Sequence, residues 1–346
     1  MLATCHDVPF GSTYFGMNYI GSTLAEPIVP VDVGLDPDNP ASAFGLLRDG
    51  LAEGVAGALL TIIDIEGGAP RSIGTHMAVL ADGRYCGYVS GGCVEAAVAA
   101  EAISVMRGGK DRVLRFGRNS PFFDIRLPCG GGIDVAVHVR PDPALITDAA
   151  DRLAARQPFD LTLDPAAGTA RLLAPGEALP DGVFRRKYRP QTRLVLIGQG
   201  NELPVMAATA RAAGLEVIAY AIGPGALAAA ARLGTPLIQI EAAADVPAFP
   251  IDPWTAVVFL FHDHGSEAAI LQATLRSGAF YIGALGSRRT HADRSVRMLS
   301  VGFTQSEIDV IHAPIGLIER TREATPLAFS VLADIARERM RLDATA

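Results

Sequence analysis

The sequence predicts an α/β protein with two domains: an N-terminal α+β domain with a mainly antiparallel sheet, and a C-terminal Rossmann-like domain with a doubly wound parallel sheet. Three observations support this prediction. At 346 residues, with 49% hydrophobic residues, the chain can fill two cores. Its first half carries short β-branched stretches joined by hairpin signals. Its second half alternates apolar strands with helical segments.

Composition sets the domain boundaries that we expect. Residues 1–40 are rich in Gly, Pro, Ser and Thr without a regular period, which indicates an extended N-terminal arm. Residues 41–145 form the first domain and carry the cysteine motifs. Residues 146–190 are expected to be a linker region, and residues 191–346 form the Rossmann-like domain.

The first domain begins with an amphipathic stretch at 43–52 that predicts a short helix. The dipeptide Asp82-Gly83 signals a hairpin between two of the strands that follow. A longer helix is expected from Val94 to about Met106. The predicted strands are 55–64, 75–80, 84–89, 112–116 and 133–139.

The linker region offers weaker signals. Short strands are expected around 159–163 and 169–173, within otherwise loop-rich sequence. The basic cluster at 185–189 is expected to be solvated, and we assign it no chemistry.

Two motifs in the first domain place a cysteine against consecutive glycines. They are Ser90-Gly91-Gly92-Cys93-Val94-Glu95 and Pro128-Cys129-Gly130-Gly131-Gly132. Glycine permits tight or left-handed backbone, so the sulfur and nearby N–H groups can face a ligand. The helix that starts after Cys93 would lower the thiol pKa and attract an anion. A ligand with sulfur or oxyanion chemistry fits these loops, and the alternative is two ordinary buried cysteines.

The second domain follows the strand and helix order of a doubly wound sheet. A buried strand at 193–197 leads through the turn at Gly198 and Gly200 into a helix at 203–213. Thr304 and Glu307 form a capping box, and 326–342 is expected to be a long terminal helix. The other predicted strands are 216–221, 236–240, 256–261 and 279–283.

The dinucleotide fingerprint is incomplete in this domain. Leu203 stands at the third glycine position, and the second strand ends near Ala221 without an acid for a ribose hydroxyl. Two other interpretations remain: the turn binds an anion, or the Rossmann domain has a purely structural role. Redox chemistry with a dinucleotide is a minority interpretation.

The loop after the fourth strand contains His262, Asp263 and His264, and it should lie near the first turn of the domain. Adjacent side chains in an extended segment point apart, which disfavours metal ligation by all three. We expect hydrogen-bonding or proton-transfer roles, with plain loop structure as the alternative.

The loop after the fifth strand contains Ser287, Arg288 and Arg289. Arginines in the first turn of a helix oppose its dipole, so helix stability does not favour them. A bound oxyanion would offset this penalty. Ion pairs with nearby acids are the alternative.

Charge and cysteine content exclude several classes of protein. The net charge of −7 argues against a nucleic-acid or anionic-membrane partner, because both require a basic surface. The four cysteines form no C-x-x-C pair, which fits free thiols in a reducing cytoplasm. No apolar run approaches the length of a membrane span, and no basic stretch of a secretory signal precedes Arg48. A cytoplasmic location is expected.

Motifs spread in order from about residue 43 to 337 resemble the XdhC/CoxI family. They are Gly68-Ala69-Pro70-Arg71, the two cysteine motifs, the Gly198-x-Gly200 turn, His262-Asp263-His264, Tyr281 to Thr290 and His312 to Leu317. The resemblance implies a cysteine-motif domain followed by a Rossmann domain. Three places depart from the family pattern: Thr75-His76, Tyr88 and Asn201.

Proteins of this family bind molybdenum cofactor (molybdopterin) and help mature and load enzymes of the xanthine dehydrogenase type. The resemblance therefore implies a xanthine dehydrogenase-type partner, a homodimer and, as a further partner, a cysteine desulfurase. A nucleotide form of the cofactor is an open alternative. The implied metal ligands are Cys93 and Cys129. The implied cofactor contacts are Arg71, Ser90, Gly91, Gly92, Cys93, Glu95, Cys129, Gly130, Gly198, Gly200, His262, Asp263, Ser287, Arg288 and Arg289.

Three classes of function remain open on these grounds. The first is a cofactor-binding maturation factor or chaperone. The second is an NAD(P)- or nucleotide-dependent oxidoreductase, against which the missing ribose acid counts. The third is a scaffold that only bridges partner proteins, against which the glycine-flanked thiols count. An accessory protein is favoured over a catalyst.

Overall fold

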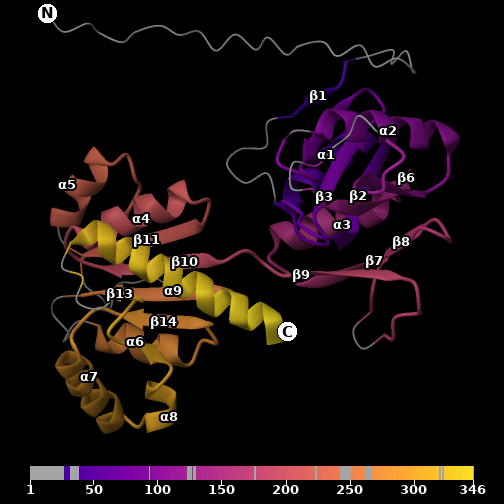
Figure 1. The fold of residues 1–346 in the computed structure, drawn as a ribbon. Helices are drawn as coiled ribbons and strands as arrows, with labels where there is room; N and C mark the ends of the chain where they lie inside the picture. The colour runs from indigo at the N-terminus through magenta and orange to yellow at the C-terminus, as the bar shows by residue number, and fades with distance from the viewer. Residues whose placement is uncertain are drawn as a thin grey trace, which may run out of the picture.

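The computed structural model describes residues 27–31, 39–92, 94–122, 127, 130–174, 177–222, 224–241, 251–261, 267–318, 321 and 323–345. Figure 1 shows two lobes, with a small three-stranded sheet beside the first of them. The expected arm at 1–40 lies largely outside the described residues. Its described part includes β1 (Val29–Pro30), which pairs with the first domain's sheet.

The first domain is built on a six-stranded sheet with the order β1-β4-β3-β2-β6-β5. All pairs are antiparallel except β1 with β4, as the sequence predicts for most of the sheet. The strands after β1 are β2 (Gly57–Glu66), β3 (His76–Leu80), β4 (Arg84–Gly87), β5 (Arg112–Gly117) and β6 (Gly132–Val139).

Successive side chains of β2 point to opposite faces of this sheet, so each face carries its own core. On one face, Leu60 packs with α2 (Glu95–Gly108). On the other face, Leu59 packs with α1 (Pro40–Ala52) and α3 (Pro143–Ala154). The predicted helices at 43–52 and 94–106 are confirmed within two or three residues at each end.

The short strands expected around 159–163 and 169–173 are confirmed as β7 (Phe159–Asp164) and β8 (Thr169–Leu172). The segment 146–190 is less loop-rich than expected, because it also contains most of α3 and β9 (Phe184–Tyr188), which completes a sheet with the order β8-β7-β9. The signal for α3 is Asp142, whose carboxylate caps the helix by accepting from Ala144 N at 2.9 Å.

The basic cluster at 185–189 is mostly strand β9 rather than a solvated linker. Arg185 and Lys187 are exposed, while Tyr188 is buried in the core that also contains Phe44 and Leu161. Charged residues mark an edge strand here. The three-stranded sheet therefore completes the core of the first domain.

The second domain has a six-stranded parallel sheet with the order β12-β11-β10-β13-β14-β15, the order of a Rossmann fold. Its strands are β10 (Arg193–Gly198), β11 (Glu216–Ile222), β12 (Ile238–Ile240), β13 (Thr255–Leu260), β14 (Tyr281–Ala284) and β15 (Ile311–His312). All five predicted strands are present, and β15 is the one that the sequence pattern did not predict.

Helices cover both faces of the parallel sheet (Figure 1). On one face, α4 (Glu202–Ala212) and α9 (Ala324–Thr345) share a core with Leu196. The remaining helices are α5 (Pro224–Arg232), α6 (Ala268–Leu275), α7 (Arg288–Ser300) and α8 (Gln305–Ile308), and α8 starts with the predicted capping box. No helix of the described chain is long and apolar enough to span a membrane.

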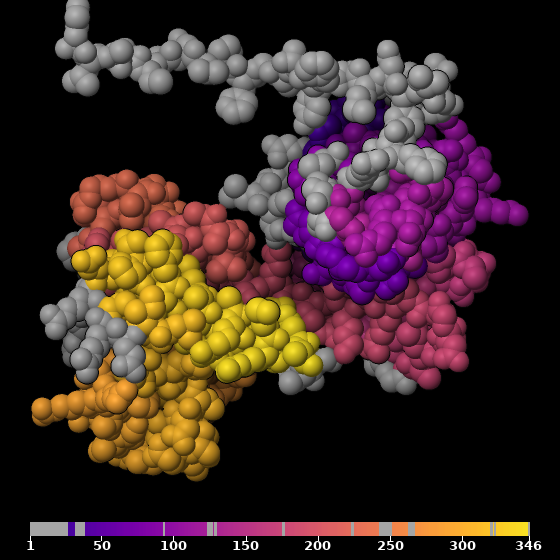
Figure 2. Space-filling model, viewed as in Figure 1, coloured from indigo at the N-terminus to yellow at the C-terminus, as the bar shows by residue number. Residues whose placement is uncertain are grey.

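The two lobes meet beside the three-stranded sheet, whose strand β9 lies nearest the second lobe in Figure 1, and Figure 2 shows the pink surface of this part of the chain beneath the first lobe. Arg156 crosses this junction: its Nε donates to Asp252 Oδ2 at 2.8 Å and its Nη1 to Glu216 Oε2 at 2.9 Å. Arg339 of α9 donates to the Pro190 carbonyl oxygen at 2.8 Å. Ion pairs and hydrogen bonds therefore contribute to the junction.

Candidate functional site

Three loops come together at one end of the first domain's sheet. They follow β2, follow β4 and precede β6, whose residue Gly132 pairs with Glu66 of β2. Gly131 lies so close to Gly68 that a Cβ there would collide with the Gly68 carbonyl oxygen. Arg71 Nε donates to the Ser90 carbonyl oxygen at 2.8 Å. The structure thus brings the described members of the predicted first-domain site, such as Arg71, Ser90 and Gly130, into one neighbourhood.

Glu95 holds the first cysteine loop in shape. Its Oε1 accepts from Ser90 N at 2.7 Å and from Ser90 Oγ at 2.8 Å, and its Oε2 accepts from Val94 N at 3.1 Å. The Ser90 and Glu95 side chains are both buried. We therefore assign them a positioning role and not the ligand contact that the sequence suggested. The carboxylate also sits favourably at the start of α2.

The glycines of the two cysteine motifs present open backbone. Gly91, Gly92 and Gly130 are exposed, and no atom lies within 4 Å of a Cβ built on Gly91 or Gly130. Gly92 and Gly130 have φ of 98° and 69°, which other residues rarely adopt. The Gly130 N–H already donates to the Leu127 carbonyl oxygen at 2.9 Å, so the open space beside it does not free this donor for a ligand. Cys93 and Cys129 themselves lie outside the described residues.

Arg115 is a site residue that the sequence patterns did not reveal. Its Nη2 pairs with Glu66, its Nη1 donates to Asp134 Oδ1 at 3.2 Å, and its Nε donates to the Arg118 carbonyl oxygen at 3.0 Å. A Cβ on Gly132 would lie 2.7 Å from the Arg115 guanidinium carbon. Arg115 therefore closes the base of the loop that carries Cys129. Its position opposite Asp134 in the β5–β6 pair is the sequence signal that could have revealed it.

Cys86 differs from the cysteines of the glycine motifs. It is buried, its Sγ donates to the Ser42 carbonyl oxygen at 3.3 Å, and burial raises its pKa to about 12. A thiol with this pKa is a poor ligand and a poor nucleophile. Among the described residues no group of three or more His, Cys, Asp or Glu side chains is placed to hold a metal.

A second set of predicted residues lies at the carboxyl edge of the parallel sheet. Gly198 ends β10, and a Cβ there would collide with the Leu260 carbonyl oxygen. Gly200 has φ 76° in the turn before α4. Gly198 thus lets the neighbouring strand approach closely, and Gly200 adopts the left-handed backbone of the turn. His262 and Asp263 lie outside the described residues.

The loop before α7 carries the predicted polar residues, Ser287, Arg288 and Arg289, where it enters the helix. Ser287 is the N-cap residue, and its Oγ accepts from Thr290 N at 3.2 Å. Arg288 and Arg289 are exposed in the first turn. A cavity of about 820 Å³ opens beside Ser287 and Arg288. It is lined by Glu202, Leu285, Gly286, Ser287, Arg288, Pro314, Ile315, Gly316, Leu317, Ile318, Thr321, Leu327 and Arg337.

A buried ion pair supports this loop from behind. Arg294 and Glu267 are both about 1% exposed, with Arg294 Nε donating to Glu267 Oε1 at 2.6 Å. Arg294 Nη2 also donates to the Leu285 carbonyl oxygen at 2.9 Å. The pair ties the start of α6 to the loop before α7. Its members are 27 residues apart, and sequence reasoning missed it.

The two sets of residues belong to different domains, one at an end of the antiparallel sheet and the other at the carboxyl edge of the parallel sheet. The first set combines exposed glycines with Arg71, and the second combines the start of α7 with Arg288 and Arg289. Both arrangements suit anions or oxyanion-bearing ligands. The fold and these sites define a two-domain protein with a glycine-loop domain and a Rossmann domain.

Comparison with known proteins identifies its family. Residues 50–117 match the model of the XdhC and CoxI family, and residues 194–335 match the XdhC Rossmann domain. The chain is also 37% identical, over 84% of its length and 86% of the relative, to a protein of Escherichia coli (strain K12) named molybdenum cofactor insertion chaperone PaoD. The chain belongs to the XdhC and CoxI family, as its motifs suggested.

Two further comparisons agree with the fold. The chain is 24% identical to a protein of Bacillus subtilis (strain 168) that is named as a probable xanthine dehydrogenase subunit, over 86% of this chain and 98% of that protein. A crystal structure from Bacillus halodurans, described as a xanthine dehydrogenase, aligns with a TM-score of 0.65 at 21% identity. It covers 86% of this chain and 96% of its own, which supports the two-domain architecture.

Proposed function

We propose that this protein is a molybdenum cofactor-binding maturation factor, a chaperone that delivers the cofactor to a molybdoenzyme of the xanthine dehydrogenase type. The observation that carries the proposal is the 37% identity to a protein named a molybdenum cofactor insertion chaperone. The name of the Bacillus subtilis relative, a probable subunit of xanthine dehydrogenase, supports the choice of target enzyme.

The glycine loops of the first domain suit one end of such a cofactor. Open space beside Gly91 and Gly130 lets a ligand approach the backbone of both loops. When bound, the cofactor supplies a metal with soft sulfur and oxo ligands, for which the thiolates of Cys93 and Cys129 are matched donors. Arg71 ties the loop after β2 to Ser90, so both loops would bind the ligand as one unit.

The cavity beside Ser287 and Arg288 suits a second, phosphate-bearing part of the ligand. Its volume of about 820 Å³ lies within the usual range of ~300–1,000 Å³ for small-molecule sites. The helix start and the guanidinium groups can donate hydrogen bonds to a phosphate. We assign Gly198, Gly200, His262, Asp263 and Arg289 to the same ligand, and a nucleotide form of the cofactor would occupy more of this edge.

The alternative function, an NAD(P)-dependent oxidoreductase, has weaker support. The strand β11 ends in Ala221 and Ile222, where a ribose-binding acid would be expected, and Leu203 stands in place of the third glycine. A carrier needs only to bind and release its cargo. An accessory role in the cytoplasm, as a homodimer, with a cysteine desulfurase as a further partner, is part of this proposal.

Cofactor content tests the function directly. The protein is purified without oxygen from a cofactor-producing cytoplasm and then oxidised, and released pterin fluorescence and molybdenum are measured. Both are expected to copurify in a fixed ratio to the protein. Protein free of pterin and molybdenum, despite a cytoplasm that produces both, would contradict the proposal.

A further inference from the structure

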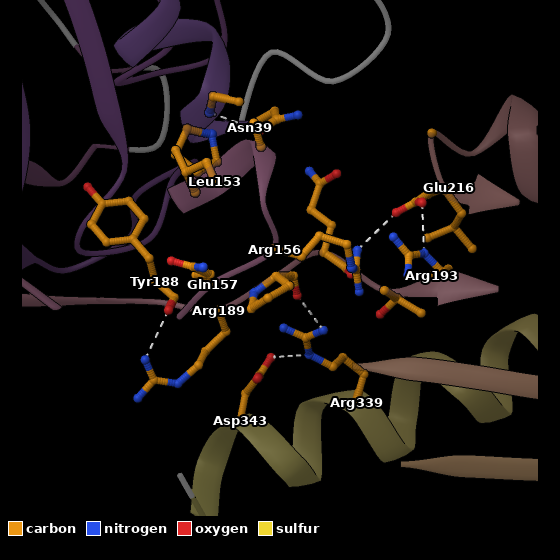
Figure 3. Close-up of a pocket in the computed structure, with 18 of the residues that line it drawn as sticks. Asn39, Leu153, Arg156, Gln157, Tyr188, Arg189, Arg193, Glu216, Arg339 and Asp343 are labelled. Carbon is orange, nitrogen blue, oxygen red and sulfur yellow. Dashed lines mark hydrogen bonds and ion pairs between the residues drawn. The ribbon is translucent and has the colours of Figure 1, made fainter. Parts of the chain in front are cut away.

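A second cavity, of about 610 Å³, lies at the junction of the two domains (Figure 3). Segments distant in the sequence line it: the start of α1, the end of β9 and the residues after it, the residues that follow α4, and α9. Its walls include apolar side chains such as Pro40, Leu153 and Leu215. Cavities at domain interfaces are common sites for small molecules.

Among the described residues, five arginines line this cavity: Arg156, Arg186, Arg189, Arg193 and Arg339. Four of them have carboxylate partners. Arg156 pairs with Asp252 and Glu216, Arg193 with Glu216, Arg189 with Asp160, and Arg339 with Asp343. Four guanidinium groups thus share four carboxylates, one of which, Asp160, also pairs with Arg185 outside the cavity, and Arg186 adds a fifth positive charge. The lining carries excess positive charge.

Arg186 has no ion pair among the described residues. Its Nε is buried and lacks a hydrogen-bond partner, and its guanidinium lies 5.7 Å from the centre of the Tyr188 ring. An aromatic face attracts a cation but accepts no conventional hydrogen bond from Nε in this arrangement. A buried donor without an acceptor is costly, and the described residues supply none for this Nε.

The backbone makes room for this side chain. Gly74 is buried at φ 84°, and a Cβ there would lie 2.6 Å from Arg186 Cδ. His76, a neighbouring titratable side chain, is neutral because burial and the Arg186 charge lower its pKa to about 3. Since no described acid forms an ion pair with Arg186, its charge remains available to an anion that enters the cavity.

We propose that the junction cavity binds the phosphate group of a small phosphorylated molecule, with Arg186 as its principal contact. A dianionic phosphate offsets the excess charge and offers acceptors for guanidinium donors. The apolar walls at Pro40, Leu153 and Leu215 contact the organic part of the molecule. Because Arg186 belongs to the first domain's side and Arg339 to α9, the ligand contacts both lobes and restricts their relative motion.

Titration with inorganic phosphate tests the proposal. Calorimetry at low salt, on the full chain, should show saturable binding, and Arg186→Gln should weaken it at least tenfold. Arg185→Gln is the matched control, since Arg185 is a neighbour on β9 that is exposed and lies outside the cavity. This control should bind phosphate as the parent does. Arg339→Gln should also weaken phosphate binding. This second variant tests the cavity independently if Arg186→Gln fails to fold.

The outcomes separate this site from the one proposed at the Rossmann edge. Phosphate binding that survives Arg186→Gln and Arg339→Gln but is lost in Arg288→Gln would assign the anion to the Rossmann edge and overturn the junction proposal. Absence of saturable phosphate binding would overturn it as well. Neither result bears on the pterin and molybdenum content that tests the carrier function.

Discussion

At the scale of single residues, we expect the three cysteines of the first domain to differ in what they can bind. Cys86 is buried, with its pKa raised to about 12, whereas Cys93 and Cys129 adjoin exposed glycines. Cys93→Ser and Cys129→Ser are each expected to lower copurified pterin and molybdenum several-fold, because serine removes the soft ligand. Metal analysis and pterin fluorescence measure the loss.

Cys86→Ala is the matched control for these variants, because it removes a thiol that contacts only the protein interior. It should keep the parent's cofactor content, whatever its cost to stability. Parental pterin and molybdenum in both Cys93→Ser and Cys129→Ser would show that the thiols are not ligands.

Arg289 allows a similar test at the Rossmann edge. It is exposed in the first turn of α7, where a cation opposes the helix dipole. Arg289→Ala should therefore lower cofactor occupancy and leave the melting temperature of the cofactor-free protein nearly unchanged. Arg297→Ala, in the last turn of the same helix, is the control and should not affect occupancy. An unchanged occupancy combined with earlier melting of Arg289→Ala would make this arginine structural.

Residue types and spacing predicted where the loops gather, but not which side chains are held by hydrogen bonds inside a loop. Ser90 and Glu95 looked like ligand contacts, yet they bond to each other inside the loop. That pairing depends on how the chain turns between Ser90 and the start of α2. Likewise the buried pair Arg294 and Glu267 depends on tertiary packing that periodicity does not encode.

At the scale of elements, the start of α2 depends on one carboxylate. Removing the Glu95 side chain leaves three donors, on Ser90 and Val94, without their acceptor. We expect Glu95→Ala to lower the free energy of unfolding by ~2–4 kcal/mol, since each buried unsatisfied group costs about 1–3 kcal/mol and water replaces part of the loss. Urea unfolding measures this change.

Glu101→Ala, on the same helix, is the control for Glu95→Ala. The pKa of Glu101 is raised by partial burial, so its carboxylate adds little stability and its removal should be nearly neutral. Equal effects of the two substitutions would argue against a special role for Glu95 in holding the loop.

The sequence predicted elements well where one apolar face dominates. Strands β2, β3 and β6 and most strands of the parallel sheet follow from their patterns. Helix α3 and strand β9 did not, because α3 is capped by an isolated Asp142-Pro143 and β9 carries three consecutive basic residues. What fixes β9 is its pairing with β7 and the burial of Tyr188, both long-range effects.

At the scale of the whole molecule, His76 makes stability depend on pH. It is the first residue of β3, and its side chain reaches β9, with Nδ1 2.8 Å from Thr61 Oγ1 and Nε2 hydrogen-bonded to the Tyr188 hydroxyl. Burial and the Arg186 charge lower its pKa from 6.5 to about 3. Below pH 6.5 the unfolded chain binds a proton that the folded protein does not bind until about pH 3. Stability is therefore lost as the pH falls through this window.

The slope due to this one group is up to ~1.4 kcal/mol per pH unit. His76→Gln removes the titrating group, so its urea midpoint should fall less between about pH 7 and pH 5 than that of the parent. Denaturation curves across this range measure the difference. Parallel pH profiles for parent and variant would show that His76 does not titrate abnormally.

The order of the two domains along the chain was predictable, but their junction was not. Arg156 and Asp252 are 96 residues apart, and only the folded structure pairs them. The junction cavity likewise draws on segments from α1 to α9. Periodicity describes neighbours along the chain, whereas contacts between domains depend on how the completed surfaces meet.

Strand β1 has a consequence for solubility. Val29 N donates to Gly83 O at 3.0 Å and Val31 N to Tyr85 O at 2.8 Å, so this short segment covers the outer edge of β4. Without it, the β4 backbone would present unpaired donors and acceptors to other molecules, the usual starting point of edge-to-edge aggregation. A shortened chain that begins at Asn39 should keep both domains but self-associate as its concentration rises.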